Sequence, residues 1–211
     1  MIETMKKYDI REAVMAGKVS KTLLYKSKIT PDLRAVKLLL SLKDRRDDSV
    51  LLAIAEELAQ EGVTLLDISR FCSALLASKG VLTKDAPSDQ EWKDIAFGWK
   101  VAKELGRLDI GQTVVVKNQA VMAVEAIEGT DEAIKRGGIL SGKDAVVVKV
   151  SKPNQDMRFD VPVIGLDTLK AMKTVRARVL AVEANKCIVL NRDKIIDEAK
   201  TAGISIVGYA E

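Results

Sequence analysis

Apolar residues recur every three or four positions in several stretches of the chain, which is the period of an amphipathic helix. Thr30 followed by Pro31 is a strong helix start, and Ser88 has the capping-box spacing to Glu91. Gly62 closes the middle stretch, because a residue without a side chain readily ends a helix. The sequence therefore predicts three helices, over residues 30–42, 49–62 and 88–106. Short strands are expected beside them, over residues 13–16 and 63–66.

The second half of the chain alternates short apolar runs with turn residues, which is typical of strands joined by tight turns. Asn118-Gln119 and Asn185-Lys186 each predict a hairpin, and Asp167-Thr168 predicts a helix cap. Gly137-Gly138 is expected to end a short helix, and Gly203 a later one over residues 193–202. The expected strands cover residues 113–116, 121–126, 145–150, 179–184, 187–190 and 204–207. These elements predict an α/β chain, with helices packed on a mixed sheet.

The loop at Thr83–Pro87 is the best candidate for a domain boundary. It divides the chain into predicted domains 1–87 and 88–211. Trp92 and Trp99 share the helix that follows this loop, and we expect them to pack between the two halves.

One charged stretch, Lys152–Pro162, stands between two apolar segments. Read as an extended strand, it places Asp156, Arg158 and Asp160 on one face and apolar residues on the other. The two carboxylates would then lie roughly 13 Å apart, so they could not share one small cation. Two interpretations remain open, a solvated ladder of ion pairs and a catalytic segment.

The chain contains no histidine, 34 basic and 30 acidic residues, and 4% aromatic residues. Without histidine, imidazole bases, Ser-His-Asp triads and histidine-containing zinc sites are excluded. Metal chemistry must then use carboxylates, which favour a hard cation such as Mg²⁺. The nearly even charge and the scarce aromatic residues argue against nucleic-acid binding.

Localisation is inferred from apolar runs and cysteines. No apolar run in the sequence is long enough to cross a bilayer, and charged residues near the N-terminus argue against a signal peptide. Cys72 and Cys187 are far apart and each sits in an apolar run, so free thiols and a reducing compartment are expected. We therefore expect a cytoplasmic protein, which is compatible with a lipid substrate taken from a membrane face.

Several polar residues could meet a phosphate. Gly17-Lys18 follows a predicted strand, although an ordinary turn is the favoured explanation of this pair. Lys152 and Arg158 are typical phosphate ligands, and Glu125 interrupts an otherwise apolar strand. Carboxylates with lysine and arginine, in the absence of histidine, favour metal-assisted attack of water on a phosphate.

Three motifs carry a resemblance to a known family. Asp109–Val116, Ala123–Asp131 and Lys152–Gly165, in this order, resemble the I-type UDP-2,3-diacylglucosamine pyrophosphatases of lipid A biosynthesis. Ala16–Val19 and Pro31–Arg34 resemble the same family. The resemblance implies Mg²⁺-dependent hydrolysis to 2,3-diacylglucosamine 1-phosphate (lipid X) and UMP, with water attacking the α-phosphorus of the UMP moiety.

The resemblance also implies an architecture and a set of site residues. It implies two domains that hold the lipid, a homodimer, and peripheral contact with the inner membrane face. Either Asp156 or Asp160 would be the essential carboxylate, and both would be metal ligands with Glu128 and Asp131. The implied substrate-binding residues are Gly17, Lys18, Glu125, Thr130, Lys152, Gln155 and Arg158.

The sequence departs from the family pattern at the N-terminus, where a glycine-rich strand-loop-helix is expected ahead of Met1. The first domain is therefore interpreted as a truncated Rossmann-like part, followed by a C-terminal mixed-sheet domain. The alternative function is a truncated domain that binds nucleotide or lipid without catalysis.

Overall fold

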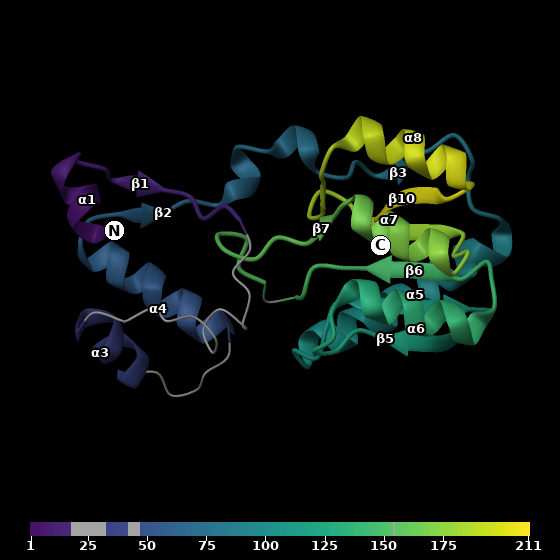
Figure 1. Cartoon of the computed structure of the whole chain (residues 1–211), viewed down its shortest axis with the longest axis horizontal. Coiled ribbons are helices and arrows are strands. Elements are labelled where there is room, and N and C mark those ends of the chain that lie inside the picture. The colour runs from purple at the N-terminus through teal and green to yellow at the C-terminus, as the bar shows by residue number, and fades with distance from the viewer. Residues whose placement is uncertain (18–32, 42–46, 154) are drawn as a thin grey trace. The chain divides into compact units, whose positions relative to one another are not determined.

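The chain divides after Phe71 into two units, seen here in a computed structural model that describes residues 1–17, 33–41, 47–153 and 155–211 (Figure 1). The first unit comprises Met1–Phe71 together with Asp156–Asp160. The second comprises Cys72–Gln155 and Val161–Glu211. Both units mix helices with strands, which confirms the predicted α/β class with two parts.

The first unit is built around helix α4, Asp47–Gln60, and Gly62 follows its end with φ +79°. Beside it lie helices α1 (Ile2–Lys7) and α3 (Leu33–Ser41) and the short parallel strands β1 (Glu12–Ala13) and β2 (Thr64–Leu65). The predicted start of α3 at Thr30 lies outside the described residues. The small buried core of this unit consists of Ala55, Leu58, Val63 and Leu65.

The second unit contains a six-stranded sheet with the order β3-β10-β8-β6-β4-β5. Its centre is three parallel strands: β6 (Val146–Lys149), β8 (Val179–Glu183) and β10 (Ser205–Tyr209). Antiparallel strands extend it on both sides: β3 (Gly80–Val81), β4 (Thr113–Lys117) and β5 (Ala120–Val124). The turn at Asn118-Gln119 joins β4 and β5, which confirms the first predicted hairpin.

Helices cover both faces of this sheet (Figure 1). Helix α5 (Asp89–Arg107) packs on one face, and its start has the predicted capping box between Ser88 and Glu91. The other face carries α6 (Thr130–Ser141), α7 (Leu166–Thr174) and α8 (Arg192–Ala202). Both faces are covered, which accounts for the nearly uninterrupted apolar sequence of the central strands, such as Val146–Val148 in β6 and Val179–Val182 in β8.

The predicted end of α6 at Gly137-Gly138 is wrong, since the helix continues to Ser141. A Cβ atom on Gly137 would lie 2.5 Å from the Cβ of Val115, and one on Gly138 would lie 2.3 Å from that of Val175. These glycines are therefore needed for close packing and do not stop the helix. By contrast, Gly203 ends α8 in a left-handed conformation, as predicted.

The second predicted hairpin is also wrong. Strand β8 pairs in parallel with β6 and β10, while β9 (Ile188–Val189) pairs in parallel with β7 (Val163–Ile164). The turn at Asn185-Lys186 is present, but the chain that follows it joins a separate two-stranded sheet. Every residue of β8 is buried, as expected for a central parallel strand and unlike a half-exposed hairpin strand.

Two smaller predictions need correction. Trp99 packs on the sheet of the second unit and contacts Tyr209 edge to face, with ring centroids 5.1 Å apart, and Trp92 joins the same core. The tryptophans therefore belong to the core of one unit. Asp167-Thr168 does not cap α7, since the residue before that helix is Gly165 and no side chain caps it. Within the described parts of the chain, no helix combines the length and apolarity needed to span a membrane.

Candidate functional site

The carboxyl ends of β6, β8 and β10 meet at one edge of the sheet, because these strands are parallel. Lys149 ends β6 and Glu183 ends β8, while Thr113 begins β4 opposite Lys149. Glu125 follows the last residue of β5 and therefore lies at the same edge. Ligands of open α/β sheets usually bind at this edge, so its polar residues are the first candidates for a site.

One buried polar cluster at this edge joins Glu125, Thr130 and Lys149. Thr130 donates from its hydroxyl to Glu125 Oε1 at 3.1 Å, and Lys149 Nζ donates to Thr130 Oγ1 at 3.1 Å. Glu125 is 8% exposed and Lys149 is 6% exposed. Glu125 Oε2 is buried and makes no hydrogen bond within the described residues. The cluster therefore retains an acceptor that a ligand hydroxyl, a water molecule or a cation could fill.

A second buried cluster surrounds Glu183. Its Oε2 accepts from Lys103 Nζ at 2.5 Å and from the backbone N–H of Ser151 at 2.8 Å, and Lys186 contacts its Oε1. Burial alone raises the pKa of the Glu183 carboxyl. The hydrogen bonds from Lys103, Lys186 and Ser151 outweigh burial, so this pKa lies below its ordinary value and Glu183 is ionised at neutral pH.

The segment that begins at Ser151 is held by its own side chains. Gln155 Oε1 accepts from the Ser151 hydroxyl at 3.0 Å and from the Lys152 backbone N–H at 2.8 Å. Lys152 Nζ forms an ion pair with Asp109 at 2.5 Å. Gln155 and Lys152, both predicted to bind substrate, thus lie together beside the carboxyl edge of the sheet.

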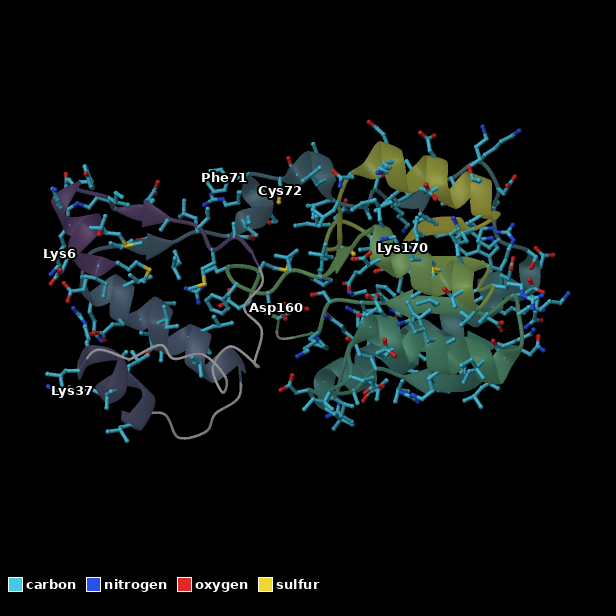
Figure 2. The ribbon with its side chains drawn as sticks, viewed as in Figure 1. Lys6, Lys37, Phe71, Cys72, Asp160 and Lys170 are labelled. Atoms are coloured by element: carbon cyan, nitrogen blue, oxygen red, sulfur yellow. The ribbon has the colours of Figure 1, made fainter. Side chains whose placement is uncertain are left out.

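The extended interpretation of the charged stretch is wrong, because residues Asp156–Asp160 form a tight turn in the first unit. The backbone N–H groups of Phe159 and Asp160 both donate to the Asp156 carbonyl, at 3.2 and 3.1 Å. Phe159 packs against the small core of the first unit, which accounts for the bend. Asp160 is labelled in Figure 2. The turn brings Asp156 and Asp160 together, so the separation expected for a strand does not apply.

Arg158 orients the Asp156 carboxylate. Its Nε lies 2.9 and 3.0 Å from the two carboxylate oxygens, its Nη2 donates at 2.6 Å, and its backbone N–H donates at 3.0 Å. The side-chain hydrogen bonds from Arg158 are the main cause of a lowered pKa at Asp156. Asp156 is therefore an ionised, oriented carboxylate that keeps part of its surface in solvent.

The remaining predicted site residues belong to neither of the two polar clusters nor to the turn that carries Asp156. Glu128 and Asp131 flank the start of α6, and Glu128 pairs with Arg136. The backbone N–H of Glu128 itself, followed by Arg136, lowers the pKa of the Glu128 carboxyl. Gly17 has φ +118°, a backbone conformation that favours glycine, whereas Lys18 lies outside the described residues.

The acids of the described residues form no cluster of three or more that could hold a metal ion. Such a cage is not required for Mg²⁺, which keeps several waters and usually binds one or two carboxylates together with substrate phosphates. The turn that carries Asp156 and Asp160 offers two carboxylates of this kind. This donor set fits Mg²⁺ better than a transition metal that prefers nitrogen or sulfur ligands.

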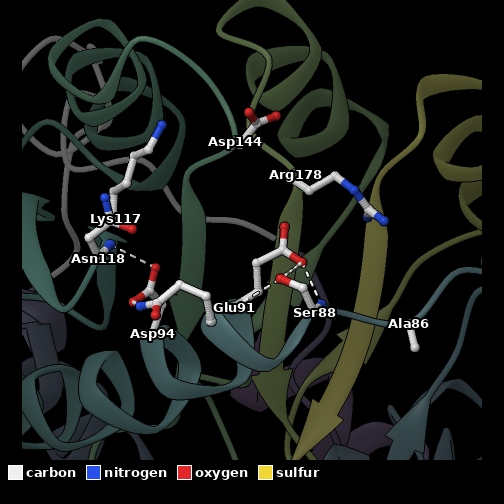
Figure 3. A pocket seen from close by; sticks show the side chains of 9 residues that line it. Ala86, Ser88, Glu91, Asp94, Lys117, Asn118, Asp144 and Arg178 are labelled. Carbon is white, nitrogen blue, oxygen red and sulfur yellow. Dashed lines mark hydrogen bonds between the residues drawn. The ribbon is translucent and has the colours of Figure 1, made fainter.

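A pocket of about 500 Å³ lies at the opposite edge of the sheet, beside the start of α5 (Figure 3). Asp94, which lines it, is 3% exposed and accepts hydrogen bonds from the backbone N–H groups of Asn118 at 2.8 Å and Gln119 at 2.7 Å. The side chain of Gln90 donates to it as well. Asp94 thus secures the β4–β5 turn, and the pocket contains none of the residues predicted for catalysis.

The carboxylate, lysine and arginine side chains of this α/β fold are compatible with an enzyme that hydrolyses phosphate compounds. Comparison with known families identifies the protein class more specifically. The family model described as the LpxI N-terminal domain matches residues 1–75, and that of the LpxI C-terminal domain matches residues 78–207. The chain belongs to the LpxI family. It is 32% identical over 204 residues to the UDP-2,3-diacylglucosamine pyrophosphatase LpxI of Caulobacter vibrioides, covering 92% of this chain and 72% of that protein.

Sequence reasoning missed three charged residues at the carboxyl edge: the buried Lys149 and Glu183 and the partly exposed Lys103. A signal was present for two of them, because Lys149 interrupts the run Val146–Val150 and Glu183 ends an otherwise apolar strand. The same signal had singled out Glu125. Lys103 carried no comparable signal, since lysine is ordinary on the exposed face of a helix.

Proposed function

We propose that this chain is a Mg²⁺-dependent hydrolase that converts UDP-2,3-diacylglucosamine to lipid X and UMP. The observation that carries the proposal is the match of both family domains, with a named pyrophosphatase as a relative over 92% of the chain. The ionised, oriented carboxylate of Asp156 supports the same reaction class.

In the proposed reaction the oxygen of water bonds to the α-phosphorus of the UMP moiety. The bond from that phosphorus to the bridging oxygen breaks, and the bridging oxygen leaves with the phosphate of lipid X. A carboxylate with a lowered pKa is a weak base. We therefore assign Asp156 to accept a hydrogen bond from the attacking water, and the proton of this water passes to solvent.

The proposed ligands of Mg²⁺ are Asp156 and Asp160, which share one turn. When bound, the ion neutralises charge that develops on the phosphate oxygens. Glu128 pairs with Arg136, and Asp131 lies in the first turn of α6, where an acid is favoured electrostatically. We assign these two acids to the support of that helix end. Lys152, Gln155, Thr130 and Glu125 remain the proposed contacts to the substrate.

The proposed setting follows from the substrate. A diacylated sugar nucleotide is delivered from a membrane face, so we propose a cytoplasmic protein with peripheral contact to the inner membrane. We also propose a homodimer, which light scattering coupled to size-exclusion chromatography would test by measuring the molar mass in solution.

The function is tested by incubating the purified chain with UDP-2,3-diacylglucosamine labelled in the α-phosphate, with Mg²⁺ or with EDTA. We expect labelled UMP and unlabelled lipid X only with Mg²⁺, and recovery of turnover when Mg²⁺ is restored. In ¹⁸O-water the label should enter UMP. ¹⁸O in the phosphate of lipid X would contradict the proposed attack on the α-phosphorus. Binding of UMP or lipid X without any turnover would favour the non-catalytic alternative.

A further inference from the structure

Two lysines, the partly exposed Lys103 and the buried Lys149, hold the two ends of the segment that carries Asp156. Lys103 of α5 donates to the main-chain carbonyl of Ser151 at 2.9 Å, and Lys149 of β6 donates to that of Val163 at 2.9 Å. By its contacts, the chain leaves the second unit after Gln155 and rejoins it at Val161. Both lysine contacts lie in the second unit, on either side of this excursion.

Each ammonium group has further partners that fix its own position. Lys103 Nζ pairs with Glu183 at 2.5 Å and lies 4.9 Å from the centroid of the Trp99 ring. Lys149 Nζ bonds the Thr130 hydroxyl, which in turn bonds Glu125. The two anchors are therefore parts of separate hydrogen-bond networks at the carboxyl edge of the sheet, each built around a buried carboxylate, Glu183 or Glu125.

Stability alone does not account for the buried Lys149. Burying an ammonium group is costly, and apolar replacements of buried ion pairs are often neutral or stabilising. Lys149 is 6% exposed within a valine strand, where another valine would complete the pattern. A charged donor at this position holds the carbonyl that it binds in a fixed place, since hydrogen bonds from charged groups are shorter and stronger than neutral ones.

We propose that Lys103 and Lys149 are positioning residues, which fix the entry and exit of the segment that carries the catalytic turn. They act through the main chain at Ser151 and Val163 and do not touch the substrate. The inference rests on the proposed function, because the turn matters for catalysis only if Asp156 takes part in the reaction. The anchoring itself is a property of the free protein and is measurable without substrate.

The test compares Lys103→Met and Lys149→Met with the wild type by steady-state kinetics and by hydrogen exchange of peptides covering residues 151–163. We expect kcat to fall between about tenfold and 10²-fold with KM within about twofold, because misplacement of a reacting group by about 1 Å costs that much. Amide exchange within residues 151–163 should accelerate, whereas exchange in α7 should not change.

The matched control is Lys173→Met, which removes an exposed lysine that pairs with Glu198 at 3.2 Å on the same unit. It should change neither kcat nor exchange in the segment. Lys103→Arg keeps a donor for both Ser151 and Glu183, and it should recover most of the kcat lost in Lys103→Met. A lysine with a purely structural role would lower the melting temperature and leave kcat and the exchange of the segment unchanged.

The proposal is overturned if kcat and the exchange of residues 151–163 are both unchanged in Lys103→Met. If Lys149→Met does not fold, Lys103→Met and Lys103→Arg decide the outcome with the same readouts. If the wild type shows no turnover while the exchange of the segment still accelerates in Lys103→Met, the proposed function fails and the anchoring stands.

Discussion

The two ends of the parallel strands in the six-stranded sheet, its amino and carboxyl edges, each hold a buried carboxylate, and the two carboxylates differ in hydrogen bonding. At the amino edge, Asp94 accepts hydrogen bonds from two backbone N–H groups and one side chain, and it secures a turn. At the carboxyl edge, Glu125 bonds one hydroxyl, and its second oxygen is buried without a hydrogen bond within the described residues. A buried acid whose acceptors are filled stabilises the fold, whereas one with an unfilled acceptor remains available for a ligand.

Glu183 shows that position at the carboxyl edge is not sufficient for such a role. It lies at the end of β8, yet Lys103, Lys186 and the backbone of Ser151 fill its acceptors. The comparison therefore separates the residues of this edge into those that face a ligand and those that hold the chain around them.

The largest expected effect is that of Asp156→Asn. Removing the ionised carboxylate should lower kcat by about 10³-fold or more, because both the orientation of water and the proposed metal ligation depend on the charge. The matched control at the amino edge is Asp144→Asn, which alters an exposed acid that lines the pocket of Figure 3. Its kcat should stay within about twofold of the wild type. Equal losses in the two variants would contradict a catalytic role for Asp156.

A second comparison sets Glu125→Gln against Asp94→Ala. Glu125→Gln keeps the shape of the side chain and should lower kcat by about tenfold or more, with little change in melting temperature. Asp94→Ala leaves two buried N–H groups unpaired and should lower the free energy of unfolding by about 2–4 kcal/mol, with kcat unchanged for the folded protein. Urea unfolding and steady-state kinetics measure the two quantities. The reverse pattern would contradict the assignment of the two edges.

A smaller effect is expected for the pH dependence of stability. The folded-state pKa of Glu183 is lowered, so its contribution to stability is present above the unfolded value of about 4.5 and is lost as the pH falls through the folded value. The difference in melting temperature between the wild type and Glu183→Gln should therefore shrink between pH 6 and pH 3. A difference that is constant over this range would rule out an ionised Glu183 in the folded protein.

The smallest effect concerns the thiol at the carboxyl edge. Burial raises the pKa of Cys187 to about 12, so almost none of it is thiolate at pH 8. Alkylation of the folded protein at this pH should leave Cys187 unmodified and kcat unchanged, as mass spectrometry and kinetics would show. Rapid labelling of Cys187 without unfolding would contradict its burial.

Local signals predicted the helices well and the strand partners less well. The capping box at Ser88 and the glycines at positions 62 and 203 act within a few residues, so the sequence shows them directly. The partners of β8 and β9 depend on strands far along the chain, and no local pattern distinguishes a hairpin from two parallel pairs.

The site was predicted only in part, because some of its features depend on local sequence and others on distant contacts. Glu125 was found because an acid interrupts an apolar strand, and Asp156 because it lies in a charged motif. The bend at Asp156–Asp160 was missed, since Phe159 finds an apolar core from a distant part of the sequence. The alternation of polar and apolar residues that predicts a strand also arises in a turn that buries one aromatic ring.

The close packing of helices on the sheet limits the substitutions that this sequence can accumulate. A Cβ atom on Gly98 of α5 would lie 2.8 Å from Val148 of β6 and 3.0 Å from Val116 of β4. One on Gly137 of α6 would lie 2.5 Å from Val115, on the other face of β4. Enlarging either glycine alone forces a clash. Neutral change at these positions is therefore expected in compensating sets, a larger residue on the helix together with smaller ones on the strands. Gly98 should covary with Val148 and Val116, and Gly137 with Val115, among relatives.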